Sequence, residues 1–421
     1  MECGFCRICF MKIWINTILN ASGLIIPAVI SLPAMGYIAR SLGVEGFGVF
    51  LLLFGILGYA SIFDFGLNRA LVLYFAKNQN DVKKDSTLFF TGLVFVLMVS
   101  VFVGLLAFCF SDQIFLILNL SDEIKGDAIL AIKSLSVAIP LTLLSLVMFS
   151  VFEGKQLFFE LNVVKIISGS MIGVLPAVFV FLKDSIFFAI LGVVFARLVV
   201  NIILACKCFK FFDVENLKWS FATLKQLLKF GGWITLSNIM SLIMSGADKF
   251  FISNLFGAKV ASFYISAMEM IVRISIVPGA LAKTIFPYFA DPSNKRKPVG
   301  FMYLGLMTIL ALLVIPLFVF SREIFSIWLG EDFSIQSSKI FIILLFGFIF
   351  NSLAQIPFAK IQASGLAKLT TLIHAFELIP YIILFFILMH YYGVIGAAYA
   401  WSFRVILDFF LLEFFRWKKN I

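Results

Sequence analysis

GYIARSLGVEGFGVFLLLFGILGYASIFDFGLNRALVLYFA, residues 36–76, decides the fold, because a version of it returns 214 residues later, at 250–290. Laid over each other without a gap, the two stretches share the pairs Ile38/Ile252, Gly43/Gly257, Ser61/Ser275 and Leu67/Leu281, and both end in Tyr-Phe-Ala. Arg69 falls on Lys283 in the same register. A repeat at about half the chain length predicts two structurally equivalent halves.

The composition places the chain in a membrane. Of its 421 residues 62% are hydrophobic and only 13% are charged, and the mean hydropathy is +1.08. That leaves too little polar surface to cover a soluble globule. A spanning helix needs about 20 apolar residues, and with roughly 10 to 15 more per connection the length accommodates about twelve spans. The apolar runs are continuous and do not alternate, which predicts an all-α polytopic membrane protein.

We expect two six-helix bundles with the same topology, related by an axis along the membrane normal, as in alternating-access carriers. The predicted spans are 13–39, 46–76, 87–110, 128–152, 158–181, 185–206, 230–252, 259–290, 299–320, 337–358, 369–391 and 393–413. The predicted organisation is a cytoplasmic N-terminus (1–12), a first bundle (13–206), a basic amphipathic linker (207–229), a second bundle (230–413) and a cytoplasmic tail (414–421).

The formal net charge of +10 reflects topology and not nucleic-acid binding. Basic residues gather in alternate loops, for example at Lys83, Lys84, Lys218 and Lys297, whereas the other loops are poor in them. The positive-inside rule therefore predicts that both termini are cytoplasmic, and that Asp122 and Asp332 face the other side.

Several motifs are weak or missing. Cys3, Cys6 and Cys9 form C-x-x-C-x-x-C without a fourth ligand at useful spacing, so we expect no metal, and residues 1–10 read as a leader before a start at Met11. His374 and His390 have no metal-ligand neighbours, and there is no phosphate-cradling glycine motif. The outward loops are too short for a catalytic domain. We expect no cofactor and no enzymatic activity.

Charges inside the spans are the site candidates, because each costs at least about 2.5 to 3.5 kcal/mol to insert and so faces a wet cavity or a partner. Arg197 and Arg404 lie near mid-membrane at equivalent positions of the sixth and twelfth spans. Facing a common cleft, two such guanidinium groups match a diphosphate. We predict Lys165 and Arg273 as secondary contacts, and Arg69 and Lys283 as attracting charges at the cytoplasmic mouth.

Acids within the spans are candidates for ion coupling. Glu269, Glu377 and Asp408 are the deep ones. The spacing of four between Glu269 and Arg273, and between Arg404 and Asp408, equally permits intrahelical ion pairs with a structural role.

The chain resembles the Wzx-type flippases, in the polysaccharide-transport branch of the MATE-like exporter superfamily. The segments that carry the resemblance are ARSLGVEGFGVF, FDFGLNRA, ADKFFISNLFG, FYISAMEM, TIFPYFA, IQASGLAKLT and YYGVIGAAYAWSFRVILDF. The resemblance implies transfer of an undecaprenyl-diphosphate-linked oligosaccharide repeat unit from the cytoplasmic to the periplasmic leaflet of the bacterial inner membrane, for O-antigen or capsule assembly. It implies that lipid-linked substrate and the membrane lipids as partners, with a polysaccharide polymerase and chain-length proteins as further ones.

Two alternatives stay open. A cation-coupled drug or metabolite exporter of the same superfamily would use acids in the N-terminal cavity, but the first span contains no Asp or Glu. A non-transporting membrane assembly protein would use the named charges in a packed interface and not in a cavity.

Overall fold

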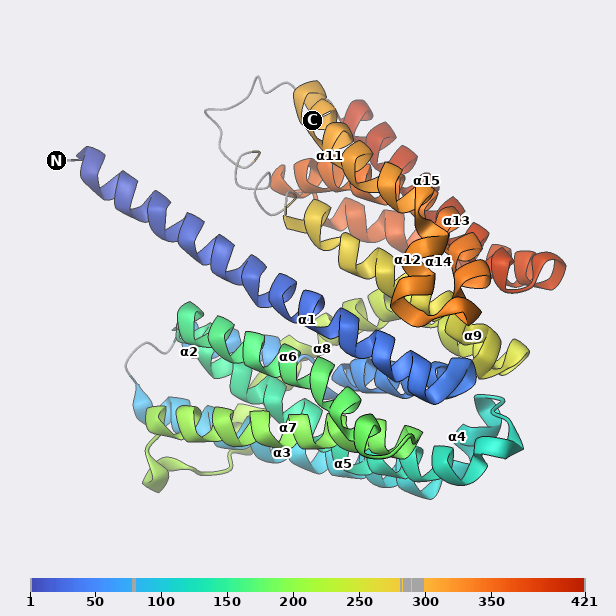
Figure 1. Cartoon of the computed structure of the whole chain (residues 1–421). Coiled ribbons are helices and arrows are strands. Elements are labelled where there is room, and N and C mark those ends of the chain that lie inside the picture. The colour runs from blue at the N-terminus through green and yellow to red at the C-terminus, as the bar shows by residue number, and fades with distance from the viewer. Residues whose placement is uncertain (1, 78–80, 281, 283–288, 290–298, 420–421) are drawn as a thin grey trace. The chain divides into compact units, whose positions relative to one another are not determined.

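The computed structural model describes residues 2–77, 81–280, 282, 289 and 299–419 (Figure 1), and these form helices joined by short connections, with no strand among them. Within these residues, ten stretches are long and apolar enough to cross a membrane. The predicted all-α polytopic architecture is therefore confirmed. Contacts divide the chain into two compact units, unit 1 (Met1–Ala247) and unit 2 (Asp248–Ile421).

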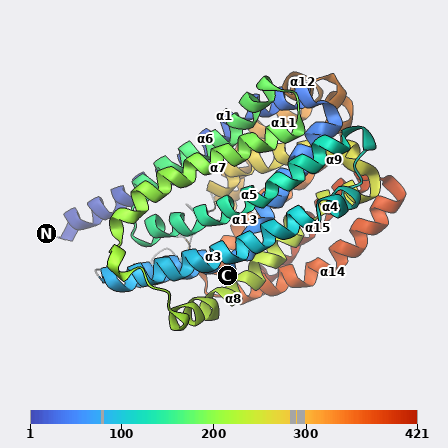
Figure 2. The same ribbon diagram turned by 90° about the horizontal axis from the view of Figure 1, so that it is seen from below.

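Unit 1 is built around one central helix, α5. Its elements are α1 (Glu2–Tyr59), η1 (Ala60–Asp64), α2 (Leu67–Lys77), α3 (Val82–Cys109), α4 (Ser111–Ile117), η2 (Asp122–Ile124), α5 (Lys125–Gly154), α6 (Phe158–Leu182), α7 (Ile186–Cys208), η3 (Phe209–Phe211), η4 (Val214–Asn216) and α8 (Phe221–Gly246). Helix α5 packs against α3 and α7, which lie alongside it in Figures 1 and 2. The α5 span is 61% buried and the α3 span only 22%, so α5 forms the core of the unit.

Unit 2 follows the same plan around α13. Its elements are α9 (Asp248–Ile274), α11 (Val299–Val319), α12 (Ser321–Leu329), α13 (Glu331–Ala363), α14 (Ala367–Tyr392) and α15 (Val394–Lys418). Helix α13 packs against α9, α12 and α15 and is 61% buried, whereas the α11 span is 11% buried. The apolar surface of α11 is thus left for lipid, as expected of a spanning helix at the outside of a bundle.

The two copies of the sequence repeat share an unusual backbone conformation at equivalent glycines. Gly43 interrupts α1 with φ 68° and ψ 178°, and Gly257 interrupts α9 with φ 81° and ψ 162°. This extended, positive-φ conformation is essentially restricted to glycine. Ser61 and Ser275, also paired in the repeat, each donate a hydroxyl hydrogen bond to a backbone carbonyl, at Gly58 and Ile271 respectively.

A second similarity between the two halves lies between the third and fourth predicted spans of each half. Helix α4 begins after Phe110 (φ −99°, ψ 22°) and α12 after Phe320 (φ −101°, ψ 20°), in the related sequences FSDQIF and FSREIF. Phe115 and Phe325 are buried at the same place in each helix. Sequence comparison at the first offset missed this pair, because the offset here is 210 and not 214.

The predicted continuous helix over 46–76 is wrong, because the chain breaks between η1 and α2. Phe65 and Gly66 both have positive φ, of 50° and 69°. The buried Asp64 fixes the turn by accepting a hydrogen bond from the Gly66 amide at 2.7 Å. A side chain at Gly66 would also collide with α8, since a Cβ there would lie 2.3 Å from the Gly231 carbonyl oxygen. The FDFG sequence is therefore a turn signal.

The predicted linker over 207–229 is ordered against unit 1. Phe212 stacks on Phe89 with ring centroids 4.2 Å apart and also contacts Phe75. Helix α8 begins at Phe221 after Ser220, whose hydroxyl accepts the Thr223 amide as an N-cap. The amphipathic stretch and the next predicted span thus form one helix up to Gly246.

Candidate functional site

Unit 2 contains a cluster of charged side chains on α14 and α15. Nε2 of His374 on α14 lies 3.4 Å from Oδ1 of Asp408 on α15. The imidazole also stacks on Phe358 of α13, with an interplanar angle of 8° and centroids 5.8 Å apart. An aromatic neighbour on one side and a carboxylate on the other fix the ring, so this histidine links three helices.

Glu377 is the most deeply buried acid of this cluster. It is 1% exposed, and among the described residues neither of its carboxylate oxygens has a hydrogen-bond partner. It lies three residues after His374, on the same side of α14. The Asp408 carboxyl lies beside it, close enough for the two acids to share a proton, and Arg404 is near enough to act on it electrostatically. Burial of an ionised carboxylate costs free energy, and binding of a cation or a proton removes that cost.

Arg404 lies against an aromatic ring and beside this acid. Its guanidinium carbon is 5.4 Å from the centre of the Tyr381 ring, a cation–π geometry. Glu377, Tyr381 and Arg404 line a small cavity of about 10 Å³, roughly the space of one water molecule. In the described part of unit 2, the basic group nearest to Asp408 is the His374 imidazole, which is charged only when protonated, and not Arg404, although the spacing of four permits the latter pair.

Helix α9 adds a second polar group in unit 2. Asp248 is buried at the start of the helix, where its carboxylate accepts hydrogen bonds from the hydroxyl of Tyr264 and from the Lys249 amide. Farther along, Arg273 and Glu269 form the intrahelical ion pair that their spacing permits, at 2.9 Å. Glu269 is thus partnered by a cation on its own helix, and Glu377 is not.

Arg197 of unit 1 is the residue paired with Arg404 in the sequence analysis. It lies half-buried on α7, and its Nε is buried with no hydrogen-bond partner. In the described part of unit 1 no acid forms an ion pair with it. Asn201, one turn later, is fixed by donating from Nδ2 to the carbonyl oxygens of Leu141 and Arg197, both at 2.8 Å. Arg197 therefore carries a charge that an anionic ligand could satisfy.

The remaining predicted cations differ in their surroundings. Arg69 on α2 is exposed and forms an ion pair with Glu153 of α5 at 3.0 Å. Lys165 lies half-buried on α6. Lys283 and Lys297 lie outside the described residues, as do the side chains of Cys3, Cys6 and Cys9. Among the described residues, no group of three His, Cys, Asp or Glu side chains is placed to hold a metal ion.

His374 and Tyr381 are not among the site residues predicted from the sequence. His374, Glu377 and Tyr381 are spaced by three and four residues, which places them on one face of α14. A polar stripe at that spacing in an otherwise apolar helix is the signal that could have identified them.

Comparisons with known proteins agree with this architecture. Residues 13–293 match the family described as "Polysaccharide biosynthesis protein". A Shigella flexneri protein described as "Putative O-antigen transporter" is 37% identical over 407 residues, which covers 96% of this chain and 97% of that protein. Two solved structures share the fold. An inward-facing multidrug resistance MATE family transporter has a TM-score of 0.79 at 14% identity, covering 96% of this chain and 98% of that one. The lipid II flippase MurJ has a TM-score of 0.72 at 18% identity, covering 95% and 87%.

Proposed function

Because the chain belongs to the polysaccharide biosynthesis protein family, we propose that it is a flippase for undecaprenyl-diphosphate-linked oligosaccharide repeat units. It moves them from the cytoplasmic to the periplasmic leaflet by alternating access, for O-antigen or other surface polysaccharide assembly. The observation that carries the proposal is the S. flexneri relative, which is similar along nearly its entire length. The substrate's headgroup is a diphosphate, and buried cations in an apolar protein suit such a group.

We propose twelve membrane crossings in two six-helix bundles. Two of the ten apolar stretches are interrupted by the equivalent glycines, Ile25–Asp64 at Gly43 and Asp248–Ala280 at Gly257. Each interruption separates two crossings. In the second stretch, the crossing that ends at Gly257 begins in α8. The other eight stretches cross once each. The proposed division keeps 13–206 and 230–413 as the bundles, with 207–229 between them.

Both termini are then on one side, which we propose is the cytoplasm of a bacterial inner membrane. The end of unit 1 where α3 begins carries Lys83, Lys84 and Lys155. The opposite end carries fewer basic residues, with Lys125 and Lys183 beside acids such as Asp127, which accepts hydrogen bonds from the Ser185 hydroxyl and the Ile186 amide. This asymmetry supports a cytoplasmic location for the lysine-rich end.

For the substrate, we assign Arg197 and Arg404 as the principal ligands of the diphosphate, each within its own unit. Among the described residues Arg197 has no acidic partner to compete with an anion, and the planar guanidinium accommodates phosphate oxygens in pairs. Lys165 and Arg273 are secondary ligands. The ion pairs of Arg273 with Glu269 and of Arg69 with Glu153 make these two cations weaker candidates.

For energy coupling, Glu377 is the first candidate and Asp408, held by His374, the second. A carboxylate that alternates between a cation-bound and an arginine-facing state can link ion movement to substrate movement. The unpartnered oxygens of Glu377 support this order, and Glu269 ranks third because of its ion pair.

Complementation tests the proposed function directly. The gene is expressed in a strain that lacks its own repeat-unit flippase, and surface polysaccharide is measured on gels. Restored polymer supports the proposal. Purified protein in vesicles with a fluorescent polyprenyl-diphosphate sugar gives the second measurement, transfer between leaflets. Absence of both, with protein present in the membrane, would contradict the proposal, and efflux of cationic drugs instead would favour the exporter alternative.

A further inference from the structure

A polar groove of about 460 Å³ lies at the lysine-rich end of unit 1. It is separate from the charged side chains inside the spans. Helices α2, α3 and α8 and the short helix η4 contribute its walls, and the side chains used below are Tyr74, Lys83, Lys84, Thr87, Asn216 and Gln226. We call it the lysine groove. Its volume is within the range of pockets that bind small molecules, roughly 300 to 1,000 Å³.

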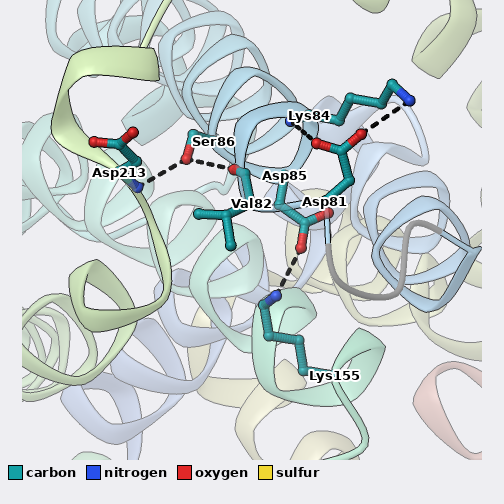
Figure 3. A network of polar contacts seen from close by, with 7 residues as sticks. All are labelled: Asp81, Val82, Lys84, Asp85, Ser86, Lys155 and Asp213. Carbon is teal, nitrogen blue, oxygen red and sulfur yellow. Dashed lines mark hydrogen bonds and ion pairs between the residues drawn. The ribbon is translucent and has the colours of Figure 1, made fainter.

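The walls of the groove are fixed by hydrogen bonds around the start of α3 (Figure 3). The Ser86 hydroxyl accepts the Asp213 amide at 2.9 Å and donates to the Val82 carbonyl. Asp213 in turn accepts from Nδ2 of Asn216 at 2.5 Å. These bonds attach the segment that carries Asn216 to α3, so the groove is preorganised and does not form only on binding.

Two acids near the groove, Asp81 and Asp85, have cationic partners, whereas a third, Asp213, accepts a hydrogen bond from the Asn216 side chain. The buried Asp85 pairs with Nζ of Lys155 at 2.6 Å, and Asp81 pairs with Nζ of Lys84 at 2.9 Å (Figure 3). Hydrogen bonds from the Lys84 side chain and amide hold the pKa of the Asp81 carboxyl below its ordinary value, so it stays ionised and offsets the Lys84 charge. Lys83 is exposed and forms no ion pair with a described residue. Of the two lysines that line the groove, Lys84 is thus paired with Asp81, and Lys83 is the one left to contact a ligand.

The other side chains suit a ligand rich in hydroxyl groups. Gln226 offers an amide donor and acceptor. Asn216 offers its amide oxygen, since Nδ2 donates to Asp213, and Thr87 offers its hydroxyl oxygen as an acceptor, since its proton is donated to a backbone carbonyl. Tyr74 adds an aromatic ring, held edge-on by Phe230 at 6.5 Å between centroids. One cation beside amides, a hydroxyl and an aromatic surface matches a phosphate attached to a polyhydroxylated group.

From this arrangement we propose that the lysine groove is a binding site for a sugar phosphate, with Lys83 as the ligand of the phosphate. The ligand's source is either a lipid headgroup at the membrane surface or a soluble sugar phosphate. The inference does not depend on flipping, because the groove is complete within unit 1.

Titration calorimetry tests this with the full-length protein in phosphatidylcholine nanodiscs and glucose 1-phosphate as the probe. We expect binding by the wild type, at least tenfold weaker binding by Lys83→Ala, and binding within twofold of wild type for Lys225→Ala. Lys225 is the matched control, since it is an exposed lysine in the first turns of α8 that does not line the groove. Glucose without phosphate should not bind. Unchanged unfolding temperatures of both variants would show that the loss is local.

Repeating the titration in nanodiscs that contain phosphatidylinositol distinguishes the sources. Loss of the glucose 1-phosphate signal there assigns the groove to lipid headgroups, and retention assigns it to soluble sugar phosphates. The inference is overturned if the probe does not bind, if Lys83→Ala binds as well as wild type, if Lys225→Ala loses as much, or if glucose binds equally. None of these outcomes bears on transport, which complementation measures independently.

Discussion

Nε2 of His374 lies 3.4 Å from Oδ1 of Asp408, and this contact joins α14 to α15 within the membrane-spanning part of unit 2. An acid at such a position needs a partner. His374→Ala should therefore lower the unfolding temperature in detergent. The double change His374→Ala/Asp408→Asn should reduce the free energy of unfolding by less than the sum of the two single changes. The expected coupling in this double-mutant cycle is about 0.5 to 3 kcal/mol. His390→Ala is the control, because His390 is exposed at the end of the same helix. Strictly additive effects would show that the contact contributes nothing.

Glu377→Gln should separate stability from transport. A neutral amide costs less to bury than a carboxylate that lacks a hydrogen-bond partner, so the unfolding temperature should stay the same or rise. Transfer of polyprenyl-diphosphate sugar in vesicles should lose its dependence on an ion gradient. Glu323→Gln, an exposed acid of α12, is the control that should retain this dependence. If Glu377→Gln flips at the full rate and still responds to the gradient, Glu377 has no part in coupling.

The sequence predicted pairs along one helix but not pairs between helices. Spacing of four correctly indicated Glu269 with Arg273, because both lie on one face of α9. The same spacing suggested Arg404 with Asp408, yet Asp408 contacts His374 from the neighbouring helix. Which faces of α14 and α15 meet depends on the rotation of each helix in the bundle, and that is set by packing over the whole unit. Spacing alone contains no such information.

The fold was more predictable than the site, because the repeat restricts the backbone directly. The pair Gly43/Gly257 could be read from the sequence, and both residues adopt a conformation that other residues rarely reach. The interruption at Phe65 and Gly66 was not predicted, since the surrounding residues are as apolar as those of a span. The hydrogen bond from the Gly66 amide to Asp64 outweighs that local preference.

Gly43→Ala should destabilise the protein through the backbone alone. A Cβ at Gly43 would meet no atom within 4 Å, so no steric contact is added, but φ of 68° with ψ of 178° is strained for alanine. The expected loss is about 1 to 3 kcal/mol. Gly58→Ala is the matched control, because it too has open space around its Cβ but ordinary helical geometry. It should be neutral or slightly stabilising. Equal behaviour of the two variants would refute the conformational requirement at Gly43.

Reporter fusions should place the lysine-rich end of unit 1 in the cytoplasm. Lys83 is the second residue of α3, a helix of 28 residues, and Asp122 lies beyond its other end. That helix is about 42 Å long at 1.5 Å per residue, enough to cross the membrane. We expect cytoplasmic signals at Lys83, Lys218 and Lys297, and periplasmic signals at Asp122 and Asp332. A periplasmic signal at Lys218 would refute the twelve-span topology.

Arg197→Ala should abolish complementation while the protein remains in the membrane at its normal amount. The diphosphate must leave water to cross the bilayer, and a fixed positive charge lowers that cost. No ion pair within the described residues is lost with Arg197, so folding should not suffer. Arg197→Lys should restore part of the activity, since lysine keeps the charge but not the bidentate geometry. Arg404 should behave alike, with Arg322→Ala, an exposed arginine of α12, as the control for both.

A purely structural role for Arg404 makes a different prediction. Arg404→Ala would then reduce the amount of folded protein, because the buried Glu377 would lose its nearby cation, and the double change Arg404→Ala/Glu377→Gln would restore it. Western blotting of membranes alongside polysaccharide gels separates the two accounts, because the transport role predicts normal protein without polymer. If surface polysaccharide is nearly normal when Arg197 and Arg404 are both replaced by alanine, neither arginine is a ligand of the diphosphate, and the translocation path must neutralise that charge elsewhere.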